Sequence, residues 1–182
     1  TFTATDNCDN SSTATQTITV EDTTSPVLSI PADYTAECSD DHPMEDASAT
    51  DNCSEVTIAV ETVETAGACA GDYSIARTFT ATDDCGNAST STQIVTLVDD
   101  TEPVFTTVPA DYTIECGLEL ILDDATAEDN CSGATVTVSE VLTPGSCPAE
   151  YTLVRTFTAT DNCENSSTAT QTITVEDTTS PV

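Results

Sequence analysis

One ten-residue stretch occurs three times and constrains the fold more than any other feature of the chain. Its copies read TFTATDNCDN from Thr1, TFTATDDCGN from Thr78 and TFTATDNCEN from Thr156, so successive copies begin 77 and 78 residues apart. A fixed period of this size indicates tandem modules. Because the sequence starts inside one module and stops at the start of another, we expect it to be an excerpt of a longer array.

A larger repeat is also present. Residues 1–27 and 156–182 differ only in having Asp9 in one copy and Glu164 in the other, which predicts a two-module unit that is itself repeated. The period divides the chain into the C-terminal hairpin of a preceding repeat over 1–24, complete modules over 25–101 and 102–179, and the start of a following repeat over 180–182.

Each copy of the stretch has the pattern of a β-hairpin. In the middle copy, Phe79 and Ala81 alternate with threonines, as in a half-buried strand. The turn Asp-Asp-Cys-Gly-Asn then leads into a second alternating run over 90–98. The alternation predicts a set of core-facing side chains, namely Tyr73, Ile75, Phe79, Ala81, Gln93, Val95 and Leu97.

Shorter elements precede the hairpin within each module. In the first module we expect strands over 27–30 and 34–38, an acidic irregular segment over 39–52, a third main strand with Val56, Ile58 and Val60 in alternation, and a loop over 66–72. Several short strands without helical periodicity predict an all-β fold. We expect tandem immunoglobulin-like β-sandwich modules of about 78 residues.

The chain is strongly acidic. It has 33 acidic residues, two arginines and no lysine, for a formal net charge of −31. This charge excludes nucleic acid as a partner, because phosphate binding needs cationic side chains. No apolar run approaches the roughly 20 residues of a membrane span. Either the carboxylates only keep the surface solvated, or some of them bind divalent cations.

Nine cysteines are many for a chain of this length. The single histidine and the lack of a Cys-x-x-Cys motif disfavour zinc binding. We therefore expect an oxidised, extracellular disulfide framework, which would stabilise a small module with a thin core. Each cysteine of the first module has a counterpart 78 residues later: Cys38 and Cys116, Cys53 and Cys131, Cys69 and Cys147, Cys85 and Cys163.

The hairpin register suggests part of the cysteine pairing. If the third strand pairs with the first hairpin strand around residue 69, Cys53 lies opposite Cys85 and Cys69 lies at the other end of the module. Opposite positions can meet the Cα separation of about 7 Å or less that a disulfide needs. Cys38 then remains at the near end of the module and Cys69 at the far end. Our default is a bond between them within the module, and the alternative is a bond from Cys69 to Cys116 of the next module.

Carboxylates at the hairpin tips favour calcium binding. In an immunoglobulin-like sandwich, the loop after the second strand and the hairpin tip share the end at which the preceding linker enters. Carboxylates from three separate segments are suitable ligands for Ca²⁺, although Asp is also common in turns that bind no ion. The predicted ligand sets are Asp22, Asp51, Asp83 and Asp84 at one junction, and Asp99 or Asp100 with Asp129 and Asp161 at the next.

The two arginines have the pattern of structural residues. Arg77 and Arg155 fall on the same strand faces as Phe79 and Phe157. We expect each stem to pack on the sheet and each guanidinium to pair with a carboxylate.

No pattern in the sequence favours an enzyme. The single histidine, His42, lies in a polar loop and has no counterpart in the next module, so it offers no repeated catalytic base. The carboxylates are expected on exposed tips rather than in a cleft that would raise the pKa of one of them.

The chain resembles HYR-like (hyalin-repeat) immunoglobulin-like modules in its Ala-Thr-Asp-x-Cys-x-Asn hairpin tips, its Asp-Thr-x-x-Pro-Val linkers and its four cysteines per module. Such modules recur in very large secreted surface proteins of Bacteroidetes-type bacteria, including adhesins linked to gliding. The resemblance implies an extracellular or cell-surface role. We expect a disulfide- and calcium-stiffened stalk or filament whose partners are neighbouring repeats and other copies in a fibre. The alternative is an adhesin that binds glycans or another surface directly.

Overall fold

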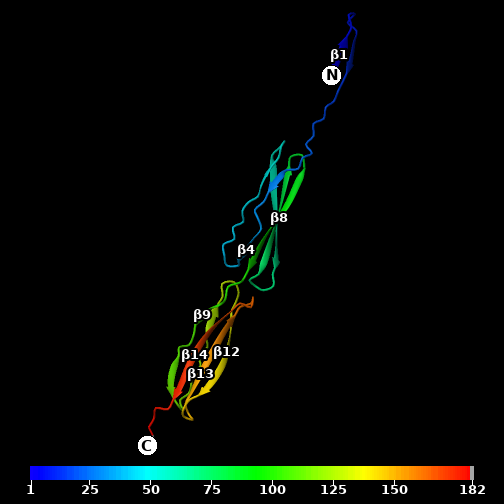
Figure 1. Cartoon of the computed structure of the whole chain (residues 1–182). Helices are drawn as coiled ribbons and strands as arrows, with labels where there is room; N and C mark the ends of the chain where they lie inside the picture. The colour runs from blue at the N-terminus through cyan, green and yellow to red at the C-terminus, as the bar shows by residue number, and fades with distance from the viewer. Residues whose placement is uncertain (181–182) are drawn as a thin grey trace.

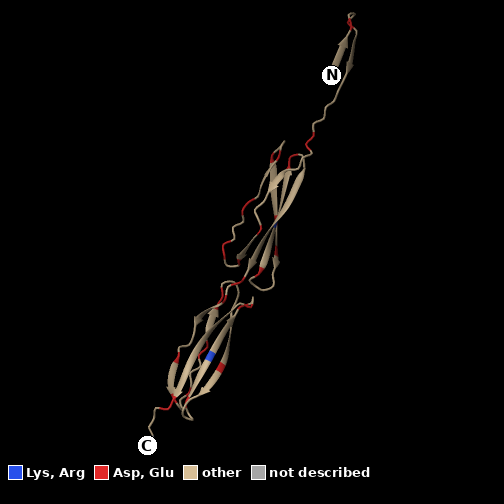
Figure 2. Cartoon of the chain, viewed as in Figure 1, with Lys and Arg blue, Asp and Glu red and all other residues tan. Residues whose placement is uncertain are grey.

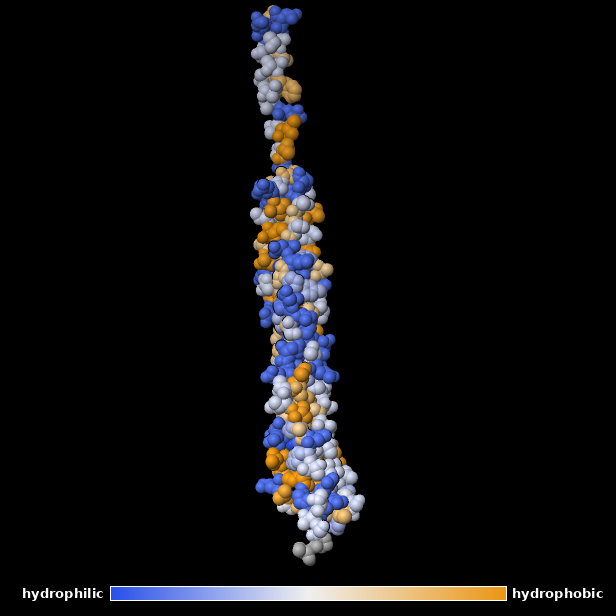
Figure 3. All heavy atoms as spheres, turned by 90° about the vertical axis from the view of Figure 1, so that its left-hand side faces the viewer, coloured by the Kyte–Doolittle hydropathy of each residue, from blue (hydrophilic) through white to orange (hydrophobic). Residues whose placement is uncertain are grey.

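The computed structural model describes residues 1–180, which form strands, turns and loops without a helix. Within this part of the chain, therefore, no helix is available to cross a membrane. The two complete modules follow one another in a slender rod, with the N-terminal hairpin at one end and the C-terminus at the other (Figure 1). Figure 3 shows the same narrow outline from the side. The last two residues of the predicted following repeat, 181 and 182, lie outside the described residues.

The two modules contain equivalent strands. The first has β3 (Val27–Ser29), β4 (Tyr34–Glu37), β5 (Ser48–Thr50), β6 (Val56–Ala66), β7 (Tyr73–Asp83) and β8 (Ala88–Val98). The second has β9 (Val104–Thr107), β10 (Tyr112–Glu115), β11 (Thr126–Glu128), β12 (Thr135–Pro144), β13 (Tyr151–Thr160) and β14 (Ser166–Glu176).

Each module is built from a four-stranded sheet and a two-stranded sheet. The larger sheets have the orders β4-β8-β7-β6 and β10-β14-β13-β12, and the smaller ones pair β3 with β5 and β9 with β11. The long hairpins β7–β8 and β13–β14 are antiparallel, whereas β4 and β10 add to the edge in parallel. The predicted all-β fold is confirmed.

The core face of the hairpin is also confirmed. Phe79 at the centre of β7 is only 2% exposed. The other predicted side chains that are buried on this face are Ile75, Ala81, Gln93, Val95 and Leu97, and Tyr73 packs against them. The alternation of period two along β7 and β8 therefore identifies the side of the sheet that is removed from water.

The two arginines are buried but differ in their partners. Arg155 Nε donates to Glu140 Oε1 at 3.1 Å, as expected for a structural ion pair. Arg77 Nη1 donates instead to the Glu45 carbonyl at 2.8 Å and to Gln93 Oε1 at 3.1 Å. The cross-strand neighbours explain the difference, because Glu140 faces Arg155 whereas Thr62 faces Arg77. The prediction that the Arg77 guanidinium pairs with a carboxylate is therefore wrong for the described residues.

Two predicted details of the first module are corrected. The segment 39–52, expected to be irregular, contains β5, which pairs with β3. The third main strand extends as far as Ala66, and its side chains Ile58 and Val60 are exposed. Exposure follows from the position of β6 as the outermost strand of its sheet.

The N-terminal hairpin shows what the same sequence does without a module around it. β1 (Phe2–Thr5) and β2 (Ser11–Ala14) pair Phe2 with Ala14, the register in which Phe157 pairs with Ala169. Phe2 is nevertheless 66% exposed, whereas Phe157 is 1% exposed. Local sequence therefore sets the hairpin, and the other strands of a module supply its burial.

Candidate metal centre at the module junction

Three carboxylates from separate segments converge where the first module meets the second. Asp99 follows β8 in the linker, Asp129 follows β11 and Asp161 follows β13. One carboxylate oxygen from each residue lies within 4.8 Å of those from the other two. The linker, the loop after β11 and the hairpin tip therefore lie together at this junction.

The hairpin tip positions Asp161 through its own turn. Asp161 Oδ1 accepts hydrogen bonds from the amides of Cys163 at 2.7 Å and Asn165 at 2.9 Å. Asn165 Nδ2 donates to Asp161 Oδ2 at 2.8 Å and to the Asp99 carbonyl at 2.9 Å. The repeated Asp-x-Cys-x-Asn pattern therefore orients a carboxylate and links the tip to the incoming linker.

The other two carboxylates each present a free oxygen. Asp129 Oδ2 accepts from the amides of Cys131 and Ser132, both at 2.9 Å, and Asp99 Oδ2 accepts from Ser132 Oγ at 3.2 Å. The remaining oxygens, Asp99 Oδ1 and Asp129 Oδ1, are buried and have no hydrogen-bond partner. Asp99 is only 6% exposed. A buried charged oxygen without a partner is costly, and a cation bound between these carboxylates would remove the cost.

The entry to the first module repeats this arrangement. Asp22, Asp51 and Asp83 offer carboxylate oxygens within 4.8 Å of one another. Asp22 Oδ2 and Asp51 Oδ1 are again buried without a partner. Asn87 Nδ2 donates to the Asp22 carbonyl at 3.1 Å, as Asn165 does to Asp99. In the described residues, the same arrangement of three carboxylates, two of them with an unpartnered oxygen, therefore occurs at the entry of both modules.

Electrostatics at the junction favour a bound cation. Burial and the nearby carboxylates of Asp129 and Asp161 raise the pKa of Asp99. Acidic residues gather around the loops and the linker (Figure 2). Arg77 and Arg155 lie within strands β7 and β13. Carboxylate oxygens from three segments suit Ca²⁺, which takes six to eight oxygen ligands and accepts carbonyls and water among them.

Two predicted ligands lie outside these clusters. Asp84 is exposed at the hairpin tip, where its amide donates to Ser54 Oγ at 3.4 Å. Asp100 is exposed as well, and its amide donates to Glu37 Oε2 at 3.2 Å. Of the two candidates in the second linker, it is therefore Asp99 that reaches the carboxylate cluster.

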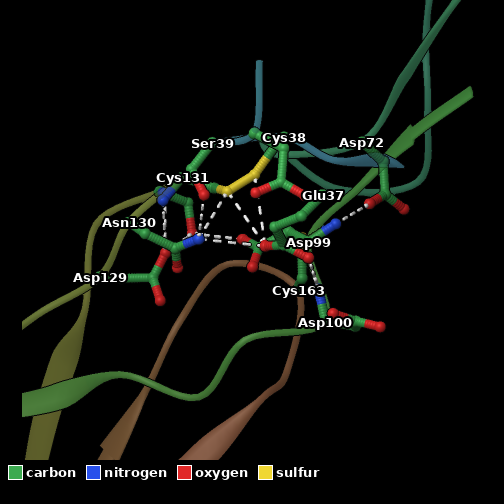
Figure 4. Close-up of a disulfide and its surroundings, with 12 residues drawn as sticks. Glu37, Cys38, Ser39, Asp72, Asp99, Asp100, Asp129, Asn130, Cys131 and Cys163 are labelled. Atoms are coloured by element: carbon green, nitrogen blue, oxygen red, sulfur yellow. Dashed lines mark hydrogen bonds between the residues drawn. A yellow bond between two sulfur atoms is a disulfide. The ribbon is translucent and has the colours of Figure 1, made fainter. Parts of the chain in front are cut away.

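Two disulfides cross the junction beside the carboxylates. Cys38 is bonded to Cys131 with a Cα separation of 5.9 Å, and Cys69 is bonded to Cys163 with a Cα separation of 5.1 Å. Figure 4 shows the first bond next to Asp99 and Asp129. Together with the linker, the two bonds give three covalent connections between the modules.

Polar contacts join the same surfaces. Asn130 Nδ2 of the second module donates to Glu37 Oε1 at 3.1 Å and to Ser39 Oγ at 2.8 Å in the first (Figure 4). Within the first module, the amide of Asp99 donates to Asp72 Oδ1 at 3.0 Å and so holds the start of the linker in place. The junction is therefore a contact between folded surfaces as well as a chain connection.

Comparison with known proteins identifies the type of the second module. Residues 104–175 match the family model of the HYR-like domain with 4 cysteines. The resemblance expected from the sequence is confirmed for this segment. The model describes a domain type and names no enzymatic activity. A search of curated proteins found no match.

Solved structures give a weaker likeness. The chain is similar to Drosophila N-cadherin EC1-4, with 16% identity and a TM-score of 0.36, over 85% of this chain and 50% of that one. It is also similar to human mucin-like protocadherin EC1-2, with 13% identity and a TM-score of 0.35, over 83% of this chain and 98% of that one. The chain thus spans half of the N-cadherin structure.

The two disulfides between the modules correct the expected pairing. Cys53 and Cys85 are not bonded to each other, and neither the default Cys38–Cys69 bond nor the alternative Cys69–Cys116 bond is present among the described residues. The strand register is one reason. β6 pairs Val56 with Asp83, one residue away from a reflection around residue 69, and a slip of one residue reverses the side to which every side chain points.

The second reason is the direction in which the modules stack. Cys38, which was expected at the near end of its module, lies with Cys69 at the end that meets the second module, where Cys131 and Cys163 approach. The sequence contained a signal for this arrangement. The same hairpin argument places Cys69 at the opposite end of its module from Cys85, and therefore beside the counterpart of Cys85, which is Cys163.

Proposed function

We propose that this chain is a structural segment of an extracellular tandem array, a stalk or filament whose junctions are stiffened by disulfides and by calcium. The observation that carries the proposal is the junction itself. Two disulfides lie between consecutive modules beside three convergent carboxylates, two of which have an unpartnered oxygen. Bonds that fix the position of one module relative to the next are expected in a rigid rod and not in a flexible chain of domains.

Calcium and the disulfides would have different roles. The disulfides connect the modules at two points, Cys38–Cys131 and Cys69–Cys163, and so restrict rotation about the linker. The ion would join Asp99 of the linker to Asp129 and Asp161 of the second module and offset their mutual repulsion. The disulfides also favour an oxidising, extracellular location.

The alternative, direct adhesion to glycans, has less support from the side chains. Sugar-binding surfaces commonly use exposed aromatic rings, and the rings of Phe79 and Phe157 are buried in the cores of the modules. We therefore propose that any adhesive part of the protein lies elsewhere and that this segment holds it away from the cell.

Thermal unfolding and small-angle X-ray scattering of the oxidised chain, with calcium or with a chelator, test the proposal. At a calcium concentration 100 times the dissociation constant, one site should stabilise the folded chain by about 2.7 kcal/mol. Scattering should show a longer, less variable particle with calcium. Equal unfolding temperatures and equal scattering in both conditions would reject the calcium role.

A further inference from the structure

The cysteines that are free in this chain repeat the positions of those that are bonded. Cys53 and Cys85 are the counterparts of Cys131 and Cys163, and they lie at the entry end of the first module. Cys116 and Cys147 are the counterparts of Cys38 and Cys69, and they lie at the exit end of the second. The chain therefore carries an unbonded entry pair at one end and an unbonded exit pair at the other.

At the entry end, the free cysteines have the same backbone contacts as their bonded counterparts. The amide of Cys53 donates to Asp51 Oδ2 at 2.8 Å, as that of Cys131 donates to Asp129 Oδ2 at 2.9 Å. The amide of Cys85 likewise donates to Asp83 Oδ1 at 2.9 Å. The entry pair is thus held in the turn geometry that is used at the observed junction.

The exit end shows the same equivalence. The amide of Cys116 donates to the Glu176 carbonyl at 2.8 Å, and the amide of Cys38 donates to the Val98 carbonyl at the same distance. The loop that holds Cys147 is closed by a hydrogen bond from Gly145 to Glu150 at 2.8 Å, which matches the bond from Gly67 to Asp72. Both ends are therefore preorganised to meet a module of the same kind.

We propose that the free pairs form two disulfides each with adjoining modules of this type, so that every junction of the array is doubly bonded. This inference rests on the proposed array. Cys53 and Cys85 bond to the preceding module's counterparts of Cys38 and Cys69. Cys116 and Cys147 bond to the following module's counterparts of Cys131 and Cys163. For each bond, two thiols lose two protons and two electrons to a disulfide oxidant such as glutathione disulfide, which is reduced to two thiols.

This connectivity creates a continuous covalent path along the array. From Cys69 the backbone passes through β7 to Cys85, only sixteen residues later, and disulfides at both cysteines continue the path into the neighbouring modules. A second path runs from Cys38 to Cys53. Tension along the rod then passes through these short stretches, and the rest of the module is bypassed.

The first path, from Cys69 to Cys85, can lengthen only slightly. Sixteen residues reach about 55 Å when fully extended, and the eleven-residue strand β7 already spans about 36 Å of that length. Unfolding a module within the bonded array can therefore lengthen it by at most about 20 Å. Without disulfides, a 77-residue repeat could extend to about 270 Å. The bonded array would therefore lengthen only slightly when its modules unfold.

An extended chain tests the inference directly. Residues 28–182 are appended after Val182, which continues the natural repeat because 156–182 matches 1–27 at all but one position. After refolding with glutathione disulfide, non-reducing peptide mapping should join Cys116 to Cys53 of the appended unit and Cys147 to its Cys85. The number of free thiols should remain at the five of the original chain, although eight cysteines have been added.

Two results would overturn the inference. One is a peptide that joins Cys53 to Cys85 within one module, and the other is a folded extended chain in which Cys116 and Cys147 stay free. Serine at Cys53 and Cys85 of the appended unit is the matched control, and it should leave the two exit cysteines free while the other bonds form. The map is made in chelator as well as in calcium, so that a failure of the calcium role does not affect the result.

Single-molecule stretching of the same extended chain measures the predicted mechanical effect. In the oxidised protein, the modules bonded at both ends should give no extension step longer than about 20 Å. After reduction, steps of about 200 Å or more should appear as each module unfolds. Long steps for those modules in the oxidised protein would contradict the covalent path.

Discussion

The side chain of Asn165 donates a hydrogen bond to the backbone carbonyl of Asp99 at 2.9 Å, across 66 residues of sequence. The same amide group donates to Asp161 Oδ2 at 2.8 Å. One side chain thus holds the linker against the hairpin tip and also orients a carboxylate of the candidate metal centre.

Replacing the side-chain amide of Asn165 should weaken both the contact with the linker and the candidate metal centre. We expect Asn165→Ala to lower the free energy of unfolding by about 1–3 kcal/mol, because a buried carbonyl and a carboxylate each lose a donor. Calcium affinity should fall as well, by about tenfold or more, since outer partners of metal ligands commonly have effects of this size. Chemical denaturation and calcium titration measure the two quantities. Asn162→Ala, at the exposed neighbouring position, is the control and should change neither.

Asp99→Asn should have opposite effects with and without calcium. In chelator, the substitution removes a buried charge that faces two other carboxylates, and it should raise the unfolding temperature. In calcium, it removes a ligand and should reduce the stabilisation by the ion. Thermal unfolding of both proteins in both conditions gives the comparison. Asp100→Asn also removes a carboxylate that faces another acid, Glu37, but it should keep the calcium response of the original chain. An equal loss of calcium stabilisation in the two variants would argue against a site at Asp99.

The raised pKa of Asp99 predicts the pH dependence of the calcium-free protein. The folded chain holds the Asp99 proton more tightly than the unfolded chain, in which the pKa is close to its ordinary value of 3.8. Stability should therefore fall as the pH rises through the interval above 3.8. Unfolding temperatures measured in chelator from about pH 4 to about pH 7 test this sign. Asp99→Asn should reduce the slope, and the raised pKa of Asp100 beside Glu37 should leave a smaller slope of the same sign. An unchanged slope would show that Asp99 does not contribute.

The pH interval is chosen so that the titration of Asp83 does not affect the comparison. Burial raises the pKa of Asp83, but hydrogen bonds from the side chain and amide of Asn87 outweigh it, and the net shift is downward. The stability that Asp83 contributes is therefore lost only as the pH falls below the ordinary range of Asp. Measurements above about pH 4 leave this contribution constant.

Arg155 should be important for folding of the second module. Its guanidinium is buried and donates to Glu140, Gln171 and the Asp123 carbonyl. Arg155→Met should cost about 3 kcal/mol or more, because buried acceptors lose their donor. Glu140→Gln keeps an acceptor at an exposed position and should cost less than about 1 kcal/mol. Chemical denaturation of the three proteins gives the comparison, and equal losses would contradict the assigned roles.

Local sequence predicted the parts of this structure that depend on neighbouring residues. The alternation through Phe79 and Ala81 identified the buried face of β7, since side chains in a strand alternate between its two sides. The expectation that linker, loop and hairpin tip share one end of a sandwich led to Asp22, Asp51, Asp83 and Asp84 as a group, and of these only Asp84 lies outside the carboxylate cluster.

The sequence was less informative where the answer depended on how elements stack. The register of β6 against β7 was misplaced by one residue, which no local pattern corrects when the edge strand has an exposed face. The bonds Cys38–Cys131 and Cys69–Cys163 depend on the rotation of one module relative to the next. That rotation results from surface contacts such as the one between Asn130 and Glu37. Such contacts cannot be inferred from the spacing of the sequence repeats.

The disulfides also impose an order on biosynthesis. Cys69 bonds to a residue 94 positions later in the chain, and Cys38 to one 93 positions later. In an array exported from its N-terminus, Cys38 cannot meet its partner until residues 102–131 have emerged, and Cys69 cannot until residues 102–163 have emerged. Oxidation would therefore lag behind translocation, and the most recently emerged module would carry free exit cysteines until its successor arrives.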